Sequence, residues 1–209
     1  MPRAQRISIV DYGMGNLRSV QKALQHVAPE AEVEITSQAQ RIRDADRVVF
    51  PGQGAMPDCM RALKEHGLGD AVAQSTRDKP FLGLCIGQQM LFEQSAEGDT
   101  PGLALLPGRV RAFERAAGLK IPHMGWNEVW QAAPHALWNG IADGSRFYFV
   151  HSFYCDPADA GLTAGTTHYP DGFTSAIARD NIFATQFHPE KSSAAGLTLL
   201  SNFSTWDPT

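Results

Sequence analysis

Up to about residue 90, apolar positions follow two alternating spacings. Short apolar runs occur at 6–12, 33–36, 47–50 and 80–85, and each has the length and composition of a buried strand. The segments 13–28, 55–68 and 86–94 instead carry apolar residues three and four positions apart, as Leu17, Val20, Leu24 and Val27 do. Strands that alternate with helices favour a mostly parallel sheet with helices on both faces. We therefore predict an α/β fold with an open, doubly wound, flavodoxin-like sheet.

After about residue 100 the pattern becomes one of strands separated by turns. The strand candidates are 108–113, 125–130, 146–154, 165–169, 173–180 and 182–190. Residues such as the Tyr-Pro-Asp-Gly run at 169–172 supply the turns. A last helix is expected at 193–204. No linker, low-complexity tract or internal repeat divides the chain, so we predict one domain over residues 1–209, with additional antiparallel strands in its C-terminal half.

The composition is that of an ordinary globular chain, with 43% hydrophobic and 19% charged residues. The net charge of −4 provides neither the basic surface that nucleic acid requires nor a cationic face for a membrane. The N-terminal segment lacks the apolar core of a signal peptide, and no apolar stretch reaches the roughly 20 residues needed to span a bilayer. These features predict a cytoplasmic protein without a nucleic-acid or membrane partner.

The cysteine and histidine spacings argue against a metal site. The three cysteines are an odd number without CxxC spacing, which also argues against a disulfide framework. The seven histidines include no HxxxH or HExxH pair. Gly13 and Gly15 follow the first strand as in a dinucleotide-binding turn, but Arg18 stands where that pattern needs its third glycine. We therefore expect neither a metal nor a cofactor.

One cysteine stands where a strand changes into a helix. In the stretch FLGLCIGQQM, Cys85 lies between Gly83 and Gly87. A strand that runs into Gly-x-nucleophile-x-Gly and then into a helix is a nucleophile elbow, in which glycines avoid clashes in the tight turn. The N–H groups at the start of the helix favour a thiolate. Cys85 is therefore the candidate nucleophile, whereas Cys59 and Cys155 lack this context and are expected to be buried structural residues.

A nucleophilic thiol needs a base and a group that orients the base. His188 ends an apolar strand, and Glu190 follows it across Pro189. The proline restricts the connection, so the carboxylate can pair with one imidazole nitrogen and leave the other for the thiol. The 103 residues between Cys85 and His188 do not prevent contact in space. His188 is therefore the candidate base and Glu190 its orienting partner.

A third element is the turn Pro-Gly-Gln-Gly at 51–54, which follows a predicted strand. Its glycines permit several backbone conformations, and its N–H groups can face a developing negative charge. Taken alone, the same pattern also describes an ordinary turn between a strand and a helix. Only its combination with the cysteine elbow and the His-Pro-Glu segment favours a functional interpretation.

Together these elements resemble the class I, or triad, glutamine amidotransferases. That family combines an oxyanion turn near Pro-Gly-x-Gly, a Gly-x-Cys-x-Gly-x-Gln elbow and a C-terminal His-Pro-Glu. The segments 11–20, 122–129, 148–153 and 187–192 are similar to those of the glutaminase subunits of imidazole glycerol phosphate synthase, an enzyme of histidine biosynthesis. The resemblance extends from about residue 7 to residue 203.

The resemblance implies a role for each matching residue. Cys85 is then the nucleophile, His188 the general base and acid, and Glu190 its orienting partner. The backbone N–H groups of Gln53 and Ile86 are the implied oxyanion donors. The glutamine site is formed by Gly52, Gly54, Gln88 and the backbone around Ser152. The family often has a small aliphatic residue in place of Gln53, but the implied role belongs to the backbone N–H, which is retained.

The resemblance also implies hydrolysis of L-glutamine through a cysteine thioester. The ammonia passes to a (β/α)8-barrel cyclase subunit in a heterodimer, which makes imidazole glycerol phosphate and aminoimidazole carboxamide ribotide. The implied interface residues are Asn16, Trp126, Tyr148 and Lys191. Two alternatives stay open. A glutaminase of another amidotransferase is opposed by the Gly-Trp-Asn and Glu-Lys-Ser segments, and a non-catalytic α/β protein with an elbow cysteine would not need His188 and Glu190 together.

Overall fold

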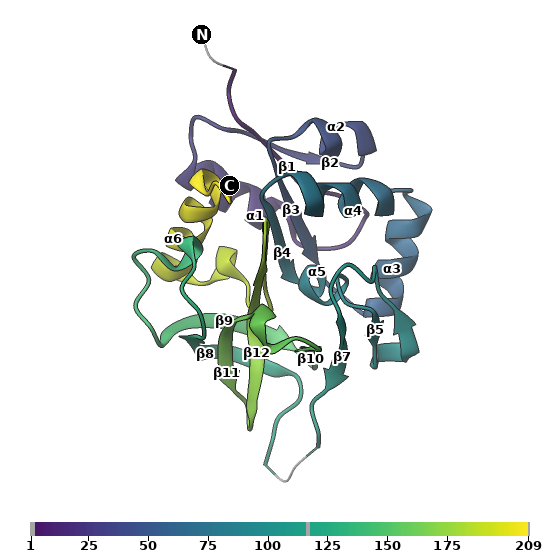
Figure 1. Ribbon diagram of the computed structural model, residues 1–209, viewed down its shortest axis with the longest axis vertical. Coiled ribbons are helices and arrows are strands. Elements are labelled where there is room, and N and C mark those ends of the chain that lie inside the picture. The colour runs from purple at the N-terminus through teal and green to yellow at the C-terminus, as the bar shows by residue number, and fades with distance from the viewer. Residues whose placement is uncertain (1–2, 116–117, 209) are drawn as a thin grey trace.

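The computed structural model describes residues 3–115 and 118–208, and its centre is a parallel sheet (Figure 1). Five strands lie in the order β2-β1-β3-β4-β13 and run parallel. They are β2 (Glu32–Thr36), β1 (Arg6–Val10), β3 (Arg47–Gly52), β4 (Phe81–Cys85) and β13 (Ile182–Thr185). Because parallel strands end at one edge of a sheet, β3, β4 and β13 deliver residues 52, 85 and 188 to the same region. The predicted α/β fold class is confirmed.

Helices cover both faces of this sheet. One face packs against α1 (Leu17–Val27) and α6 (Ser193–Thr205), and the other against α2 (Ala39–Asp44), α3 (Met56–Glu65) and α4 (Gly69–Asp78). Successive strand residues alternate between the two layers, so Val49 belongs to the first and its neighbours Val48 and Phe50 to the second. This division explains why the central strands are apolar throughout.

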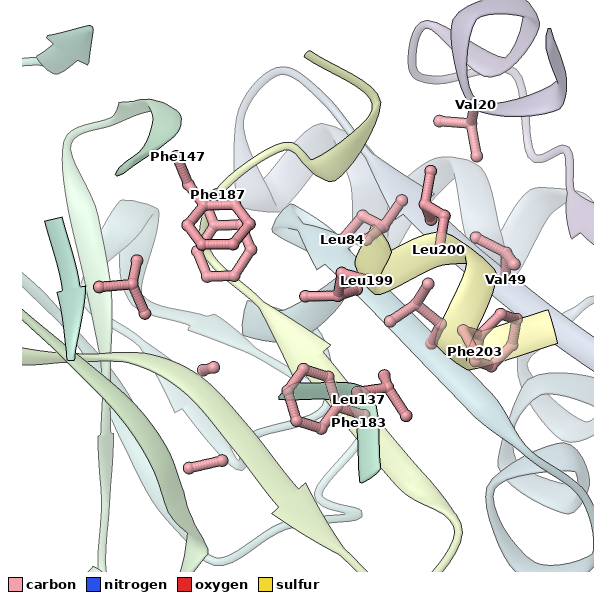
Figure 2. Packing of buried hydrophobic residues seen from close by; sticks show 14 of the residues in the cluster. Val20, Val49, Leu84, Leu137, Phe147, Phe183, Phe187, Leu199, Leu200 and Phe203 are labelled. Carbon is pink, nitrogen blue, oxygen red and sulfur yellow. The ribbon is translucent and has the colours of Figure 1, made fainter. Parts of the chain in front are cut away.

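Figure 2 shows how the first layer is packed: Leu199, Leu200 and Phe203 of α6 lie against the central strands. Val20 of α1 and Phe183 of β13 belong to the same cluster, and all five side chains are almost completely buried. Each such side chain contributes roughly 1.5–3 kcal/mol to folding. The predicted helix at 193–204 is therefore confirmed, and its buried face includes Leu199, Leu200 and Phe203.

The antiparallel strands extend the sheet beyond β13, as predicted for the C-terminal half. The order continues through β12 (Gly172–Arg179), β10 (Phe153–Pro157), β7 (Gly108–Ala112), β5 (Gln94–Ser95) and β6 (Thr100–Pro101). A branch from β12 consists of β11 (Thr163–His168), β8 (His123–Gln131) and β9 (Ser145–His151). The single strand expected at 146–154 is thus two strands, β9 and β10, which separate at Ser152.

Short 3-10 helices connect these elements, among them η1 (Glu97–Asp99), η2 (Ala136–Trp138), η3 (Ala160–Leu162) and η4 (Pro189–Lys191). The expected helix at 86–94 is shorter, because α5 spans only Ile86–Gln89. Met90, Leu91 and Phe92 are all fully buried, and one helix face cannot bury three consecutive residues. The chain leaves the helix through i→i+3 hydrogen bonds at Leu91 and Phe92 and continues into β5.

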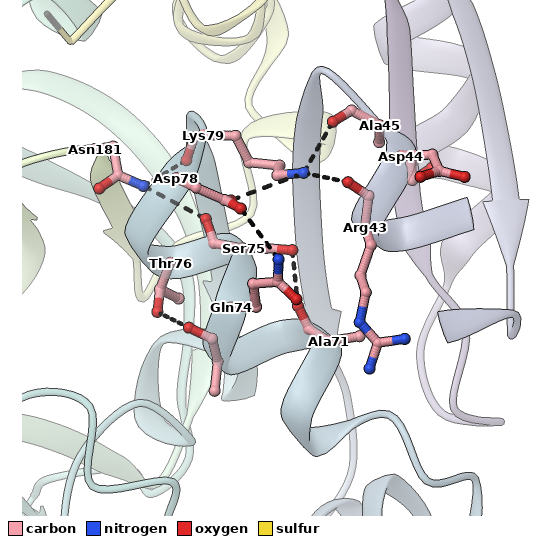
Figure 3. Close-up of polar contacts among 12 residues, drawn as sticks. Arg43, Asp44, Ala45, Ala71, Gln74, Ser75, Thr76, Asp78, Lys79 and Asn181 are labelled. Atoms are coloured by element: carbon pink, nitrogen blue, oxygen red, sulfur yellow. Dashed lines mark hydrogen bonds and ion pairs between the residues drawn. The ribbon is translucent and has the colours of Figure 1, made fainter. Parts of the chain in front are cut away.

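Helices α2 and α4 were not predicted from the sequence. The buried face of α4 includes Ser75 and Thr76, so its hydrophobic period is weak. Side chains satisfy the carbonyl groups that both helices leave unpaired at their C-terminal ends (Figure 3). Lys79 Nζ donates to the carbonyls of Arg43 and Ala45 at the end of α2, and Asn181 Nδ2 donates to those of Ser75 and Lys79 at the end of α4. These bonds fix both helices against the start of β4.

Within the described ranges, the helices are too short or too polar to cross a membrane. The same residues contain no group of three or more His, Cys, Asp or Glu side chains arranged to hold a metal ion.

Candidate active site

Cys85 lies at the tip of a tight turn between β4 and α5. Its backbone has φ 54° and ψ −113°, a left-handed conformation that is uncommon for a residue with a side chain. The flanking glycines allow neighbouring strands to approach. A Cβ on Gly87 would lie 1.9 Å from the carbonyl oxygen of Phe50, and one on Gly83 would lie 2.9 Å from Cβ of Ala184. The structure therefore places Cys85 at an elbow that contacts both β3 and β13.

His188 and Glu190 form a buried pair beside this elbow. His188 Nδ1 lies 2.9 Å from Glu190 Oε1, and the side chains are only 8% and 3% exposed. Backbone contacts hold the pair: the His188 N–H donates to the Tyr148 carbonyl (2.9 Å), and the Ser192 hydroxyl donates to the His188 carbonyl (2.6 Å). His188 Nε2 is buried and has no hydrogen-bond partner among residues 3–115 and 118–208. The carboxylate thus fixes one ring nitrogen and leaves the other for a reacting group.

The charges around His188 favour its protonated form. Burial lowers the pKa of His188, but the negative charge of a Cys85 thiolate and the hydrogen bond to Glu190 outweigh burial and raise the pKa to about 10. A thiolate at Cys85 is therefore accompanied by an imidazolium at His188. This pair supplies a nucleophile and a proton donor on one side of the same site.

Cys85 and His188 line a cavity of about 310 Å³. Its other lining residues are Gln53, Gly54, Ile86, Gln89, Glu97, Pro122, Val150, His151, Ser152, Phe153 and Lys191. The volume is at the small end of ligand-binding cavities, and it suits a ligand of amino-acid size. Of the residues predicted for oxyanion and substrate binding, the structure brings Gln53, Gly54, Ile86 and Ser152 to this cavity.

Hydrogen bonds hold the turn at 51–54 on both sides of the Gly52–Gln53 peptide. Tyr12 Oη donates to the Pro51 carbonyl (2.9 Å), and Cys59 Sγ donates to the Gln53 carbonyl (3.5 Å). Gly52 lies so close to the elbow that a Cβ would be 2.8 Å from Cβ of Ile86. The Gly52–Gln53 peptide, whose N–H is the predicted oxyanion donor, therefore lies between two anchored carbonyls.

The two other cysteines are buried and unbridged. Burial raises the pKa of Cys59 to about 11 and raises that of Cys155 well above its ordinary value. Both remain thiols near neutral pH, which agrees with the structural role expected for them.

The prediction for Gln88 is wrong about its position, because its neighbour Gln89 lines the cavity instead. The side-chain atoms of Gln88 are buried without hydrogen-bond partners in the described part of the chain. Gln89 Nε2 donates to the Phe153 carbonyl (3.0 Å) and to Gln186 Oε1 (2.9 Å). The Gly-x-Cys-x-Gly-x-Gln pattern puts its glutamine four positions after Cys85, so the motif itself contained the correct residue.

Glu97 is a further cavity residue that the sequence analysis missed. It precedes Gly98 in η1, and its Oε2 accepts the Met56 N–H at 2.8 Å. Glu97 is the carboxylate among the lining residues, so it is suited to bind an ammonium group. No pattern in the sequence distinguishes it from other acidic residues, because the fold alone brings this segment to the cavity.

The four predicted interface residues lie around the same site. Trp126 is 45% exposed on β8, directly opposite Tyr148 on β9, with ring centroids 6.2 Å apart. Lys191 Nζ lies 6.0 Å from the Tyr148 ring centroid, and Lys191 also lines the cavity. Asn16 is exposed and shares a second, much smaller pocket with His188 and Glu190. The structure therefore brings Lys191 to the cavity, with Tyr148 and Trp126 beside it and Asn16 at the smaller pocket, while their contact with a partner stays a prediction.

The chain is similar to known proteins along nearly its whole length. The family described as glutamine amidotransferase class-I matches residues 8–205. The chain is 60% identical to the imidazole glycerol phosphate synthase subunit HisH of Nitrosospira multiformis, over 97% of this chain and 98% of that protein. It is 59% identical to the subunit of the same name from Thiobacillus denitrificans, over 97% and 92% of the two chains. A solved structure of PurLQS from Thermotoga maritima has the same fold, with a TM-score of 0.74 at 17% identity over 97% of this chain and 98% of that chain. The chain therefore belongs to the class-I glutamine amidotransferase family, and within that family to the HisH subunits of imidazole glycerol phosphate synthase.

Proposed function

We propose that this chain hydrolyses L-glutamine to glutamate and ammonia as the glutaminase subunit of imidazole glycerol phosphate synthase. The observation that carries the proposal is the convergence of the Cys85 elbow and the buried His188–Glu190 pair on one cavity. Relatives about 60% identical over nearly the whole chain support the choice among amidotransferases.

In the first half-reaction, the Cys85 thiolate attacks the side-chain amide carbon of glutamine. A C–S bond forms, and the carbonyl electrons move to oxygen, which is stabilised by the N–H groups of Gln53 and Ile86. His188 donates its proton to the amide nitrogen, the C–N bond breaks, and ammonia leaves. The product is a γ-glutamyl thioester on Cys85.

In the second half-reaction, a water molecule attacks the thioester. His188 Nε2 accepts a proton from this water, while Glu190 holds the opposite ring nitrogen and stabilises the resulting imidazolium. A second tetrahedral species collapses, the C–S bond breaks, and the γ-carboxyl group gives its remaining proton to water as glutamate is released. The proton on His188 remains beside the regenerated thiolate, so the active pair is restored.

The cavity offers groups for the amino-acid end of glutamine. Glu97 provides a carboxylate for the α-ammonium, and the backbone at Ser152 provides polar groups for the α-carboxylate. Gln89 Oε1 is buried without a partner in the described residues, so it is available to accept an N–H of the substrate. These contacts explain why a free amino acid is selected, since a peptide-bound glutamine lacks both charged groups.

Ammonia released into water becomes ammonium, which is not nucleophilic. We therefore propose that a (β/α)8-barrel cyclase subunit covers the site and takes the ammonia through an internal channel. Asn16, Trp126, Tyr148 and Lys191 are the proposed contacts. The heterodimer then makes imidazole glycerol phosphate and aminoimidazole carboxamide ribotide for histidine biosynthesis, a role in keeping with a cytoplasmic protein.

The turn at 51–54 is the proposed point of control. Losing one oxyanion donor costs about 2.7–4 kcal/mol of transition-state stabilisation, so a Gly52–Gln53 peptide in the wrong orientation would nearly silence the subunit. Docking of the cyclase and its ligand would favour the active orientation, and binding must then be coupled in both directions.

The test compares glutamate release by the subunit alone, with the cyclase, and with the cyclase and its nucleotide ligand. We expect activity to rise at each step, and Cys85→Ala to remove glutamine-dependent synthesis while the complex still uses ammonium salts. Full activity in the isolated subunit would contradict the control by the partner. If the partner subunit of another amidotransferase activates the chain instead, the chain is the glutaminase of that enzyme. If no mixture hydrolyses glutamine, the non-catalytic alternative is favoured.

A further inference from the structure

Two buried histidines lie on β8 and β9, beside the cavity that His188 also lines. His151 ends β9 and lines the cavity, and His123 lies directly across from it at the start of β8. Their rings are joined by a contact of 2.9 Å between His123 Nδ1 and His151 Nε2. His123 also stacks on Tyr169, with ring centroids 4.0 Å apart. Neither histidine has a role in the glutaminase chemistry described above.

Only one assignment of donors and acceptors fits the hydrogen bonds of the two neutral rings. His151 Nδ1 lies 2.8 Å from the Phe153 carbonyl, and a carbonyl only accepts, so His151 carries its proton on Nδ1. A neutral His151 then accepts at Nε2 from His123 Nδ1, and His123 accepts at Nε2 from the amide of Asn127 (3.1 Å). Both ring nitrogens of each histidine are therefore used.

The chain of hydrogen bonds continues from the Phe153 carbonyl to the nucleophile Cys85. That carbonyl accepts from His151 and also from Gln89 Nε2. The second N–H of Gln89 goes to Gln186 Oε1, and Gln186 Nε2 donates to Cys85 Sγ at 3.8 Å. Turning the Gln89 amide around would place its oxygen against two other oxygens. The amide is therefore fixed with Oε1 as its buried, unpaired atom, in a residue that lines the cavity.

We propose that His123 and His151 are positioning residues for glutamine binding, which hold the Phe153 carbonyl so that Gln89 presents Oε1 to an N–H of the substrate. The proposal deepens the glutaminase function and rests on it. Its specific content is that an imidazole pair outside the Cys-His-Glu triad sets the affinity for glutamine without touching the reacting atoms.

Burial agrees with this role. It lowers the pKa of His151 to about 3 and that of His123 to about 4, so both rings are neutral near neutral pH. A neutral ring whose nitrogens are both hydrogen-bonded has no free site to take a proton from water or from Cys85. His151 therefore lies at the cavity as a support for its wall and not as a second base.

The experiment measures glutamine KM and kcat of the complex with the cyclase for three histidine variants. His151→Phe keeps the ring volume but removes the bond to Phe153, and we expect KM to rise about tenfold with kcat within about threefold of the wild type. His151→Asn retains an N–H donor near the Nδ1 position and is expected to recover most of the affinity. His135→Phe is the control, because it removes a half-buried imidazole that packs on Phe183 and Trp206 and does not line the cavity, and it should leave KM unchanged.

Thermal unfolding of each variant separates positioning from folding. A KM in His151→Phe equal to that of the wild type would overturn the inference, and so would an equal rise in His135→Phe. If His151→Phe does not fold, Asn127→Leu replaces it, because Asn127 lies at the outer end of the chain of bonds and is expected to raise KM by a smaller factor of about two to three. An unchanged KM there would also count against the inference. A wild-type complex that releases no glutamate would instead refute the proposed function.

Discussion

The two walls of the cavity contain buried histidines in opposite charge states. On the wall formed by β13 and η4, Glu190 and Cys85 raise the pKa of His188 to about 10 although burial alone would lower it. On the wall formed by β8 and β9, burial lowers the pKa of His151 to about 3 and that of His123 to about 4. All three side chains are nearly inaccessible to solvent.

The difference shows that burial does not decide what a histidine does. His188 has the Glu190 carboxylate at Nδ1 and the Cys85 thiolate as a second nearby negative charge, whereas the ring nitrogens of His123 and His151 contact neutral groups. The first arrangement stores a proton beside the nucleophile, and the second fixes a hydrogen-bond direction. The comparison therefore separates a residue that moves protons from residues that hold geometry.

The largest effect is expected when the charge of Glu190 is removed, because this charge helps to keep His188 protonated while His123 and His151 are neutral. Glu190→Gln keeps the shape of the partner but makes it neutral, so the pKa of His188 falls and the imidazolium loses its counter-charge. We expect kcat for glutamine hydrolysis to fall about 10²–10⁴-fold, the usual contribution of general acid–base catalysis. Steady-state glutamate release in the complex measures this effect. A loss below tenfold would mean that Glu190 is a structural neighbour only.

The adjacent glutamines provide a smaller and more selective contrast. Gln89→Met removes the acceptor at the cavity, so we expect glutamine KM to rise about tenfold. Gln88→Met buries an apolar chain of similar length in place of unpaired polar atoms, so KM should not change and the free energy of unfolding should stay equal or rise by about 1 kcal/mol. Urea unfolding and initial rates on the same two variants test the pair. A rise in KM for Gln88→Met would restore the original assignment of that residue to the substrate site.

The free energy of unfolding should change modestly with pH, and the histidines on both walls of the cavity should contribute to the change. His188 has a raised pKa, so its contribution is complete below about 6.5 and is lost as the pH rises toward about 10. His123 and His151 have lowered pKa values, so their contribution is present above about 6.5 and is lost as the pH falls toward about 4 and 3. Free energies of unfolding from pH 5 to pH 9.5 should therefore flatten on the alkaline side in Glu190→Gln and on the acid side in His151→Phe. If both variants keep the acid and alkaline slopes of the wild type, other titrating groups control the pH dependence.

Local patterns were enough to predict most of this site. The elbow glycines around Cys85 and the short His188–Pro189–Glu190 connection are local features, and the structure places them as expected. Long-range contributions were not predictable in the same way. Glu97 reaches the cavity on η1, which packs at the start of α3, and the pairing of β8 with β9 joins His123 to His151. No spacing within the sequence indicates these contacts between distant segments.

The fold shows the same limit. Strands such as β1 and β4 were predictable because their apolar runs are continuous, whereas α4 has Ser75 and Thr76 on its buried face. The hydroxyl groups of both residues bond to carbonyls of the same helix, which removes the cost of burying them but hides the helix from a hydrophobic pattern. The length of α5 was predicted wrongly for the opposite reason, because the three apolar residues after it suggest a longer helix than the packing allows.

The central claim is that Cys85, activated by the His188–Glu190 pair, attacks glutamine. The most direct measurement is mass-spectrometric mapping of the cysteines after brief treatment with a glutamine-like electrophile, with and without excess glutamine. The account predicts that Cys85 is modified well before Cys59 and Cys155, that glutamine protects it, and that His188→Ala slows the reaction. Equal modification of all three cysteines, or labelling of Cys85 that neither glutamine nor His188→Ala changes, would contradict the account.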